Sequence, residues 1–343
     1  MEFLTLFFIY VLSILTCLAL VCKYSGKGQF PLEKLFVYLT NVISHLVPER
    51  LQTVSNQILH RLFHKRNSFF LTLHFLLEAA VYGEFTYEIF GYCQEIGFSL
   101  PSLIVPYVLL TVKMYFFSQC CTKDPGTITK LNNEVFLGVY PYDQVMFYQG
   151  VLCPTCVLVK PARSKHCRVC NVCVHRFDHH CVWVNNCIGA FNTKYFLLYL
   201  MTLSAMAADI AVLTIGLLLH LVLQSNLMSA AYVDEEGHQQ PVGLFFVIQY
   251  LFLTFPRIVF MLGFLMFLFL LLLGYSFFHL YLAVTNQTAN EWYKRKSHGC
   301  QHCNPSPLQQ QSHTSLHNFY SRGTFRNLKE ILKPITKNEK KGR

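Results

Sequence analysis

Five long apolar stretches are the feature that most limits what this chain can fold into. About 20 predominantly apolar residues are needed to cross the hydrocarbon core of a bilayer, and stretches of this kind cover residues 1–22, 68–90, 100–120, 195–222 and 258–282. Of the 343 residues, 53% are hydrophobic and only 13% are charged, which is too apolar for an ordinary soluble protein of this size. We therefore predict an α-helical integral membrane protein with about five transmembrane helices.

Two of the stretches have a second interpretation. Residues 1–22 resemble a signal peptide in length, but no basic region precedes the apolar run and no small-x-small cleavage site closes it, which favours an uncleaved span. Residues 68–90 carry three glutamates, so an interfacial amphipathic helix is the alternative there.

Pro256 and Arg257 interrupt the apolar run that leads into the last stretch. Residues 223–257 are therefore expected to form a luminal loop and a re-entrant lead-in.

Lysine and arginine residues alternate between the segments that link these stretches. There are 7 in residues 23–67, none in 91–99, 8 in 121–194, none in 223–243 and 11 in 285–343. Cytosolic loops are enriched in these residues. The pattern predicts a luminal N-terminus, cytosolic segments at 23–67 and 121–194, a luminal loop at 91–99 and a cytosolic tail at 283–343. The basic residues then face a membrane surface, and nucleic acid is not an expected partner.

The segment at about residues 150–200 is a cysteine-rich module. It contains 7 of the 14 cysteines, and its spacing is C-x2-C-x9-H-C-x2-C-x2-C-x4-D-H-H-C-x5-C, without an internal repeat that we recognise from the sequence. A closed structural zinc takes four cysteine or histidine ligands, so two zincs need eight. Eleven candidates are present: Cys153, Cys156, His166, Cys167, Cys170, Cys173, His175, His179, His180, Cys181 and Cys187.

The surplus of ligands raises the question of what the remaining residues do. Two Cys3His sites would leave one cysteine and two histidines unused. Adjacent side chains point in different directions, so His179 and His180 are not expected to bind one ion. Asp178, His179 and Cys181 together offer a carboxylate, a base and a thiol, which is the set required for a nucleophilic thiolate. The alternative is that every cysteine is structural and Asp178 only orients a zinc ligand.

The module resembles a known family. The stretches "CPTC" and "KPARSKHCRVCNVCVHRFDHHCVWVNNCIGAFNTKYF" are similar to the cysteine-rich domain of DHHC protein S-acyltransferases, usually called palmitoyltransferases, without a gap from Cys153 to Phe196. "DPG", "TANE" and the tail "NFYSRGTFRN" resemble three further family motifs. Their supporting residues are Asp124, Pro125, Gly126, Thr288, Glu291 and Asn327.

The resemblance implies a role for each residue of the module. One structural zinc would be held by Cys153, Cys156, His166 and Cys173, and the other by Cys167, Cys170, His180 and Cys187. Cys181 would then be the nucleophile, His179 its base and Asp178 the group that orients the base. The family reaction moves a long-chain acyl group, palmitoyl above all, from acyl-CoA to cysteines of membrane-associated proteins through an acyl-enzyme.

Five individual residues carry further expectations. Arg163, Lys165 and Arg168 are candidates for contacts with the CoA phosphates, because they are basic and lie in a segment predicted to be cytosolic. Ala289 stands where the family usually has a second threonine, so any hydroxyl contact from this position to the catalytic centre is in doubt. His175 has no role that the resemblance assigns, and a surface or headgroup contact is expected for it.

The C-terminal end "KKGR" places Lys340 and Lys341 where a di-lysine retrieval signal would be read by a coat protein. This predicts the endoplasmic reticulum membrane, with the Golgi or plasma membrane as further locations. The alternative is a solvated basic tail. Cys300 and Cys303 are expected to be ordinary cytosolic thiols rather than a further metal or acylation site.

Two other functions compete with an acyltransferase. A membrane-anchored zinc module that only recruits partners would need the metal ligands but not Cys181. A transporter would use charges within or near the spans, such as Glu78, Asp209 and Arg257, although these show no paired pattern across repeats.

Overall fold

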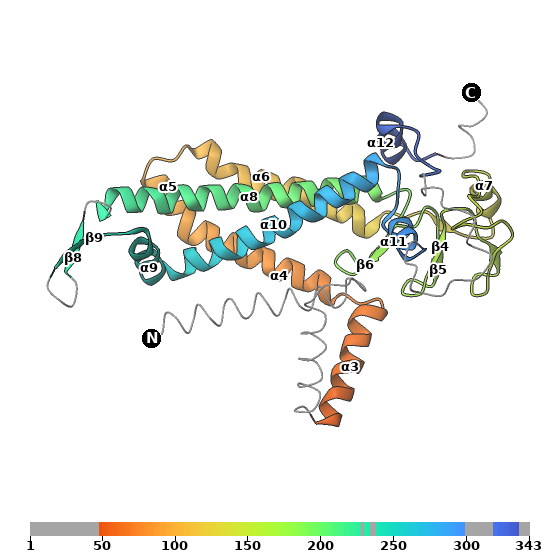
Figure 1. The fold of residues 1–343 in the computed structure, drawn as a ribbon, viewed down its shortest axis with the longest axis horizontal. Coiled ribbons are helices and arrows are strands. Elements are labelled where there is room, and N and C mark those ends of the chain that lie inside the picture. The colour runs from red at the N-terminus through yellow and green to blue at the C-terminus, as the bar shows by residue number, and fades with distance from the viewer. Residues whose placement is uncertain (1–47, 228–229, 234–237, 299–317, 336–343) are drawn as a thin grey trace. The chain divides into compact units, whose positions relative to one another are not determined.

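The computed structural model describes residues 48–227, 230–233, 238–298 and 318–335 (Figure 1). The chain divides into two units, Met1–Lys65 and Arg66–Arg343. The predicted span at residues 1–22 and the di-lysine end lie outside the described residues. In the first unit the structure describes helix α3 (Glu49–His64), which has no buried residue.

Three helices of the second unit are long and apolar enough to cross a membrane, within the part of the chain that the structure describes. They are α6 (Leu100–Thr122), α8 (Thr193–Gln224) and α10 (Pro256–Val284). Figure 1 shows α8 running beside both of the others. Their shared core is apolar and includes Phe85, Leu103, Ile210, Leu217 and Ile258. These helices cover the predicted spans at 100–120, 195–222 and 258–282.

The predicted span at 68–90 is helical, but it is divided. Helix α4 (Phe69–Glu84) continues through a π-helical turn, η1 (Phe85–Phe90), into the short α5 (Gly91–Glu95). Before the last span, α9 (Leu244–Thr254) ends at Phe255, and Pro256 starts α10. Proline is favoured at the first position of a helix, where no partner is needed for its missing N–H. The break between α9 and α10 therefore falls at Phe255, directly before Pro256.

Two charged pairs link side chains of these helices. Lys113 is completely buried in α6, and its Nζ lies 2.5 Å from a carboxylate oxygen of Glu78 and 3.0 Å from Nε2 of His74, both on α4. Arg257 at the start of α10 pairs with Glu88 at 2.8 Å. Isolated charges are costly at membrane depth. Pairing across helices explains how Glu78 and Glu88 are accommodated in the 68–90 segment.

The cysteine-rich module consists of three short antiparallel hairpins. The first joins β2 (Leu152–Cys153) to β3 (Leu158–Val159), the second joins β4 (Lys165–Cys167) to β5 (Val172–Val174), and the third joins β6 (His179–Cys181) to β7 (Asn186–Ile188). Strand β1 (Thr127–Ile128) adds to the second hairpin by pairing with β5. A separate hairpin joins β8 (Ala231–Val233) to β9 (Gln239–Pro241).

The three hairpins of the module repeat every 14 residues, which corrects the expectation of no internal repeat. The first cysteine of each turn pairs across its hairpin in the same register, as Cys153 with Leu158, Cys167 with Val172 and Cys181 with Asn186. The last residue of each turn has positive φ: Val157 (51°), Asn171 (57°) and Asn185 (49°). The same period is present in the sequence in Cys153, Cys167 and Cys181 and in His166 and His180, although the residues between them vary.

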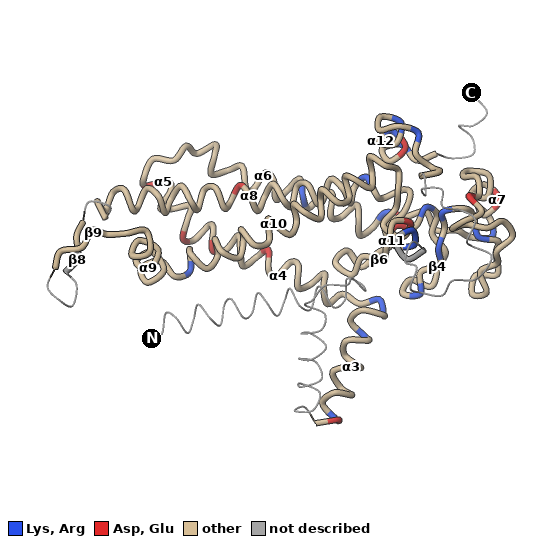
Figure 2. Tube along the Cα trace, viewed as in Figure 1, with Lys and Arg blue, Asp and Glu red and all other residues tan. Residues whose placement is uncertain are grey.

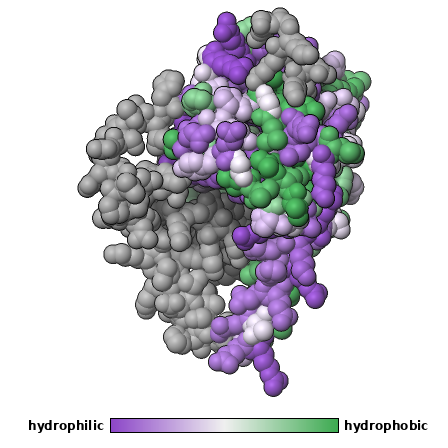
Figure 3. All heavy atoms as spheres, turned by 90° about the vertical axis from the view of Figure 1, so that its right-hand side faces the viewer, coloured by the Kyte–Doolittle hydropathy of each residue, from purple (hydrophilic) through white to green (hydrophobic). Residues whose placement is uncertain are grey.

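Basic residues gather at the end of the unit that carries the hairpins. Figure 2 shows lysines and arginines around β4, α11 (Ala289–His298) and α12 (Thr324–Leu332), and almost none around β8, β9 and α9. Helix α7 (Asn133–Leu137) lies at the same end. Where described residues are visible from this end, polar side chains surround a hydrophobic area (Figure 3). The charge distribution agrees with the alternation found in the sequence.

Candidate active site and metal-binding clusters

Two groups of four ligands are assembled by neighbouring hairpins. In the first group, Cys153 and Cys156 come from the turn of the first hairpin, while His166 and Cys173 face each other across the second. The three sulfurs lie 3.3–3.8 Å from Nδ1 of His166. The second group repeats this arrangement one hairpin further along: Cys167, Cys170, His180 and Cys187. Its sulfurs lie 3.4–3.7 Å from Nδ1 of His180.

The donor sets fit zinc. A tetrahedral zinc with Zn–S near 2.3 Å and Zn–N near 2.0 Å separates its ligand atoms by roughly 3.5 Å, which matches the observed spacing. All ligand atoms of each cluster lie within 4.8 Å of one another. The structure thus brings together the two sets that the family resemblance implied. Either cluster could bind a zinc ion without rearrangement.

Strand β6 carries the two adjacent histidines on opposite faces. Successive side chains of a strand point to opposite faces, so His180 turns toward the second cluster while His179 and Cys181 share the other face. Nδ1 of His179 lies 2.7 Å from Oδ2 of Asp178. Nε2 of His179 is buried and has no hydrogen-bond partner among the described residues. One imidazole therefore belongs to a metal-type cluster and the other is linked to a carboxylate.

Asp178 is held by contacts from several elements. Its backbone N–H donates to the carbonyl of Ile188 at 2.9 Å, which fixes it beside the third hairpin. Its Oδ1 accepts the backbone N–H of Ala289, the first residue of α11, at 2.6 Å. The positive end of a helix favours a negative charge at this place. The contact needs no hydroxyl, so alanine at this position keeps the link that the sequence put in doubt.

The charges of the three residues depend on one another. Burial alone would lower the pKa of His179, but its hydrogen bond to Asp178 and the nearby sulfur of Cys181 raise it to about 10. Burial would likewise raise the pKa of Asp178, but His179, His279 and the Ala289 N–H lower it to about 2. His179 also holds the pKa of the Cys181 thiol below its usual range, although burial opposes this. The set therefore favours a thiolate beside an imidazolium at neutral pH.

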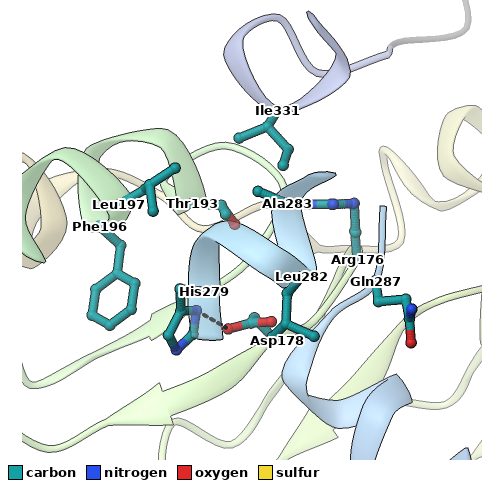
Figure 4. Close-up of a pocket in the computed structure, with 10 residues that line it drawn as sticks. All are labelled: Arg176, Asp178, Thr193, Phe196, Leu197, His279, Leu282, Ala283, Gln287 and Ile331. Carbon is teal, nitrogen blue, oxygen red and sulfur yellow. Dashed lines mark ion pairs between the residues drawn. The ribbon is translucent and has the colours of Figure 1, made fainter. Parts of the chain in front are cut away.

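His279 of α10 is a second histidine at the carboxylate, and the sequence did not point to it. Its Nδ1 lies 3.9 Å from Oδ2 of Asp178, and Figure 4 shows the two side chains facing each other. Its ring also contacts those of His179 and Phe196. A titratable residue within a predicted span is a signal of function, and this one was overlooked. The cavity beside it is lined by Arg176, Asp178, Thr193, Phe196, Leu197, His279, Leu282, Ala283, Gln287 and Ile331.

The "TANE" residues form a capping box at the start of α11. The Thr288 hydroxyl accepts the Glu291 N–H at 3.2 Å, and the Glu291 carboxylate accepts the Thr288 N–H at 3.0 Å. This reciprocal arrangement fixes the first turn of a helix. It thereby sets the position of the Ala289 N–H that meets Asp178.

Arg163 is not available for CoA phosphates, which corrects the expectation for this residue. It is completely buried, and its guanidinium binds Glu291 through two hydrogen bonds of 2.7 and 2.8 Å. It also donates to the side chain and carbonyl of Asn286 at 3.0 and 2.9 Å. Burial opposes the charge, but Glu291 raises the pKa of Arg163 above its usual value. Lys165 and Arg168, on the same hairpin, are exposed.

The "DPG" and tail motifs form hydrogen bonds next to the hairpins and at the end of α10. A carboxylate oxygen of Asp124 accepts the Thr127 N–H at 3.0 Å, where β1 begins. Gly126 has φ of 106°, a conformation that favours glycine, and its carbonyl accepts the His175 N–H at 2.8 Å. In the tail, Asn327 donates to the Val284 carbonyl at the end of α10, at 2.7 Å. The motifs therefore connect the module to the helices.

His175 is a core residue and not a surface contact, contrary to the expectation. Its side chain is completely buried and stacks on the rings of Phe136 and Tyr140. Burial, assisted by Arg163 and Arg176, lowers its pKa to about 3. A neutral imidazole at neutral pH suits this apolar stack, and the residue is too deep to reach a headgroup.

The hairpins carry a thiol, an imidazole and a buried carboxylate beside two zinc-type clusters, and they are joined to long apolar helices. This combination defines a membrane-bound thiol enzyme. The family described as DHHC palmitoyltransferase matches residues 146–296. Palmitoyltransferase ZDHHC4 of Mus musculus is 51% identical over 342 residues, which cover 99% of both chains, and its counterpart in Bos taurus is 51% identical over 340 residues, 98% of both. Palmitoyltransferase swf1 of Schizosaccharomyces pombe is 32% identical over 206 residues, 56% of this chain and 49% of the relative. The chain belongs to the DHHC palmitoyltransferase family, which confirms the resemblance.

Proposed function

We propose that this chain, a protein S-acyltransferase, moves a palmitoyl or similar long-chain acyl group from acyl-CoA to cysteine thiols of target proteins, with Cys181 as the nucleophile. The observation that carries the proposal is the arrangement of β6. His179 and Cys181 share one face, His179 is bonded to the buried Asp178, and His180 points away into a metal-type cluster. A cysteine that only served a metal would have no need of this carboxylate and imidazole.

The proposed reaction has two steps: His179 gives up a proton in the first and regains one in the second. The Cys181 thiolate attacks the thioester carbonyl of acyl-CoA, the bond to the CoA sulfur breaks, and the departing thiolate takes the proton held at His179. In the second step a target cysteine gives its proton to His179 and its sulfur attacks the acyl carbonyl. The bond to Cys181 then breaks and the thiolate–imidazolium pair returns. Asp178 stabilises the charged imidazole before and after each turnover.

The substrates would approach from two environments. The acyl chain would lie among the apolar helices, where each methylene removed from water contributes about 0.8 kcal/mol. Lys165 and Arg168 are the remaining candidates for the CoA phosphates, since both are exposed on the second hairpin. Lys165 also donates to Asn290 at 2.9 Å, which holds it near the start of α11.

The two Cys/His clusters would hold structural zinc. Each supplies four protein ligands, so a bound ion would have no open position for substrate. The ions would fix the hairpins and thereby the position of Cys181. The reacting groups themselves all come from the protein.

The cellular setting is part of the same proposal. The hairpins and the tail would face the cytosol and the N-terminus the lumen, as the lysine and arginine distribution favours. The partners would be membrane-associated proteins with cytosolic cysteines, together with membrane lipids. Residence in the endoplasmic reticulum, with a coat protein reading Lys340 and Lys341, rests on the sequence of the tail alone.

The first prediction tests the nucleophile. Purified chain incubated with labelled palmitoyl-CoA should acquire hydroxylamine-sensitive label, and Cys181→Ser should lose it, because a hydroxyl at this position does not form the reactive thiolate. Intact-protein mass spectrometry measures the label and the chain length loaded. Cys93→Ser is the control, since Cys93 is a buried cysteine of α5, and it should load normally. Undiminished label in Cys181→Ser would show that another residue is the nucleophile.

A further inference from the structure

The last turn of α6 is capped by a side chain of the third hairpin. The last four carbonyls of a helix have no partner within it, and the chain leaves α6 at Lys123 in an extended conformation. Nδ2 of Asn186, on β7, donates to the carbonyls of Cys120 and Lys123, both at 3.0 Å. It also lies 3.3 Å from the carbonyl of Cys121. One amide group therefore serves the open end of this long apolar helix.

The oxygen of the same amide is held by the hairpin. Oδ1 of Asn186 accepts the N–H of Cys187 at 2.9 Å, and Cys187 belongs to the second metal-type cluster. An amide oxygen only accepts hydrogen bonds and an amide nitrogen only donates them. The contact with Cys187 therefore fixes the direction of the side chain and leaves its NH2 group facing α6. Asn186 is buried, with 9% of its surface exposed.

Asn186 is also the residue that faces Cys181 across the third hairpin. The two residues are partners in the antiparallel register of β6 and β7. Val184 and Ile188, two residues before and after Asn186, belong to one apolar cluster with Phe117 of α6, and Cys181 packs against the same cluster. Hydrogen bonds and apolar contacts together therefore attach the Cys181 end of the hairpin to the end of α6.

We propose that Asn186 is a positioning residue for acyl transfer: by joining β7 to the end of α6, it holds the sulfur of Cys181 at a fixed place relative to the helices that would receive the acyl chain. The inference rests on the proposed function, in which Cys181 attacks the thioester while the chain lies among the helices. A chain bound there presents its carbonyl at a set place, and a displacement of about 1 Å between reacting groups can slow a reaction about a hundredfold. Asn186 would act through the hairpin backbone and not by touching the substrate.

The second prediction removes the donor that serves α6. Asn186→Asp keeps an oxygen for the Cys187 N–H, but its second oxygen repels the helix carbonyls. In the full-length chain, the single-turnover rate of acyl-enzyme formation at saturating palmitoyl-CoA should fall about tenfold or more. The palmitoyl-CoA concentration that gives half of the maximal rate should stay within about twofold, because the chain would still bind the helices. Hydrogen exchange in the last turn of α6 should become faster in the same protein.

Two further measurements separate positioning from folding. Zinc content per chain and the rate at which iodoacetamide alkylates Cys181 do not depend on alignment with the helices, so both should stay near their wild-type values in Asn186→Asp. Asn185→Asp is the matched control, since it adds the same charge at the half-buried last residue of the turn, and it should load at the wild-type rate. Asn186→Ala removes the donor and the acceptor without adding a charge, and it should slow loading in the same way as Asn186→Asp.

The inference is overturned if both Asn186 variants load as fast as the wild-type chain. It is also overturned if both lose zinc together with loading, since the asparagine would then serve only the cluster of Cys187. Equal losses in the loading rate and in the alkylation rate would contradict it as well, because the sulfur itself would then be impaired. Where Asn186→Asp does not fold, Asn186→Ala decides. Label that persists in Cys181→Ser would instead refute the proposed function, whatever the Asn186 variants do.

Discussion

At the scale of single residues, the position of the Asp178 carboxylate depends on backbone groups as much as on side chains. Asp178 receives the Ala289 N–H at 2.6 Å while its other oxygen holds His179. The sequence put any hydroxyl contact from this position in doubt, because alanine has no hydroxyl. A backbone donor is supplied by every residue except proline. The contact with Asp178 therefore does not require a hydroxyl at this position.

The third prediction follows from that contact. Ala289→Pro removes the N–H, yet proline is favoured at the first position of a helix, so α11 should still form. We expect acyl-enzyme formation to slow about tenfold, since a hydrogen bond to a charged group contributes roughly 1.5–3 kcal/mol. Single-turnover labelling with palmitoyl-CoA measures the rate. Ala289→Thr keeps the N–H and should stay within about twofold of the wild-type rate. The role of the backbone donor is refuted if both variants react equally fast.

Much of the site could be predicted from the sequence, and the exceptions have a physical cause. Counting ligands showed that a cysteine was surplus, and family resemblance identified Cys181. His279 was missed because its approach to Asp178 depends on how α10 packs, which spacing along the chain does not show. Arg163 was assigned to phosphates because a basic residue in a cytosolic loop is usually exposed, whereas here Glu291 and Asn286 surround it. Long-range contacts of this kind become visible only in the folded chain.

At the scale of elements, a buried ion pair helps to join the hairpins to the helices. Arg163 precedes β4, and Glu291 lies in the first turn of α11, so their contact holds the helix that presents the Ala289 N–H to Asp178. The Arg163 guanidinium also stacks on the rings of Tyr140 and Tyr320, and it lies 3.7 Å from Glu330 of α12. One side chain thus connects the module, α11 and the tail.

The fourth prediction concerns this connection. Arg163→Met should destabilise the chain by about 3–5 kcal/mol, because it leaves buried carboxylates without their cation. Thermal unfolding in detergent, followed by tryptophan fluorescence, should show a clearly lower midpoint. Arg168→Met is the matched control, since Arg168 is exposed on the same hairpin, and its midpoint should be within about a degree of wild type, as surface substitutions usually change stability little. Equal midpoints would mean that the ion pair contributes little to stability.

At the scale of the whole molecule, the apolar stretches predicted the helical class, whereas the hairpins could be recognised only in the structure. Stretches at 100–120, 195–222 and 258–282 match α6, α8 and α10, because the bilayer fixes the length that such a helix needs. The hairpin strands have only two or three residues each, too few for hydrophobic alternation to be read from the sequence. The hairpins are defined instead by the positions of the cysteine and histidine ligands. The 14-residue repeat of these positions explains why two complete sites leave one cysteine over.

The last prediction follows from the way the two clusters share the second hairpin. Its strands supply His166 and Cys173 to the first cluster, and its turn supplies Cys167 and Cys170 to the second. Loss of one ion should therefore loosen the other. Cys153→Ser removes a ligand from the first cluster alone, and we expect it to lower the zinc content by more than one ion per chain and to abolish acyl-enzyme formation. Metal analysis after dialysis against a weak chelator measures the content, and Cys93→Ser should retain the wild-type value. A Cys153→Ser chain that keeps one firmly bound zinc would show that the clusters fold independently, and the hairpins would then be separate modules rather than one cooperative unit.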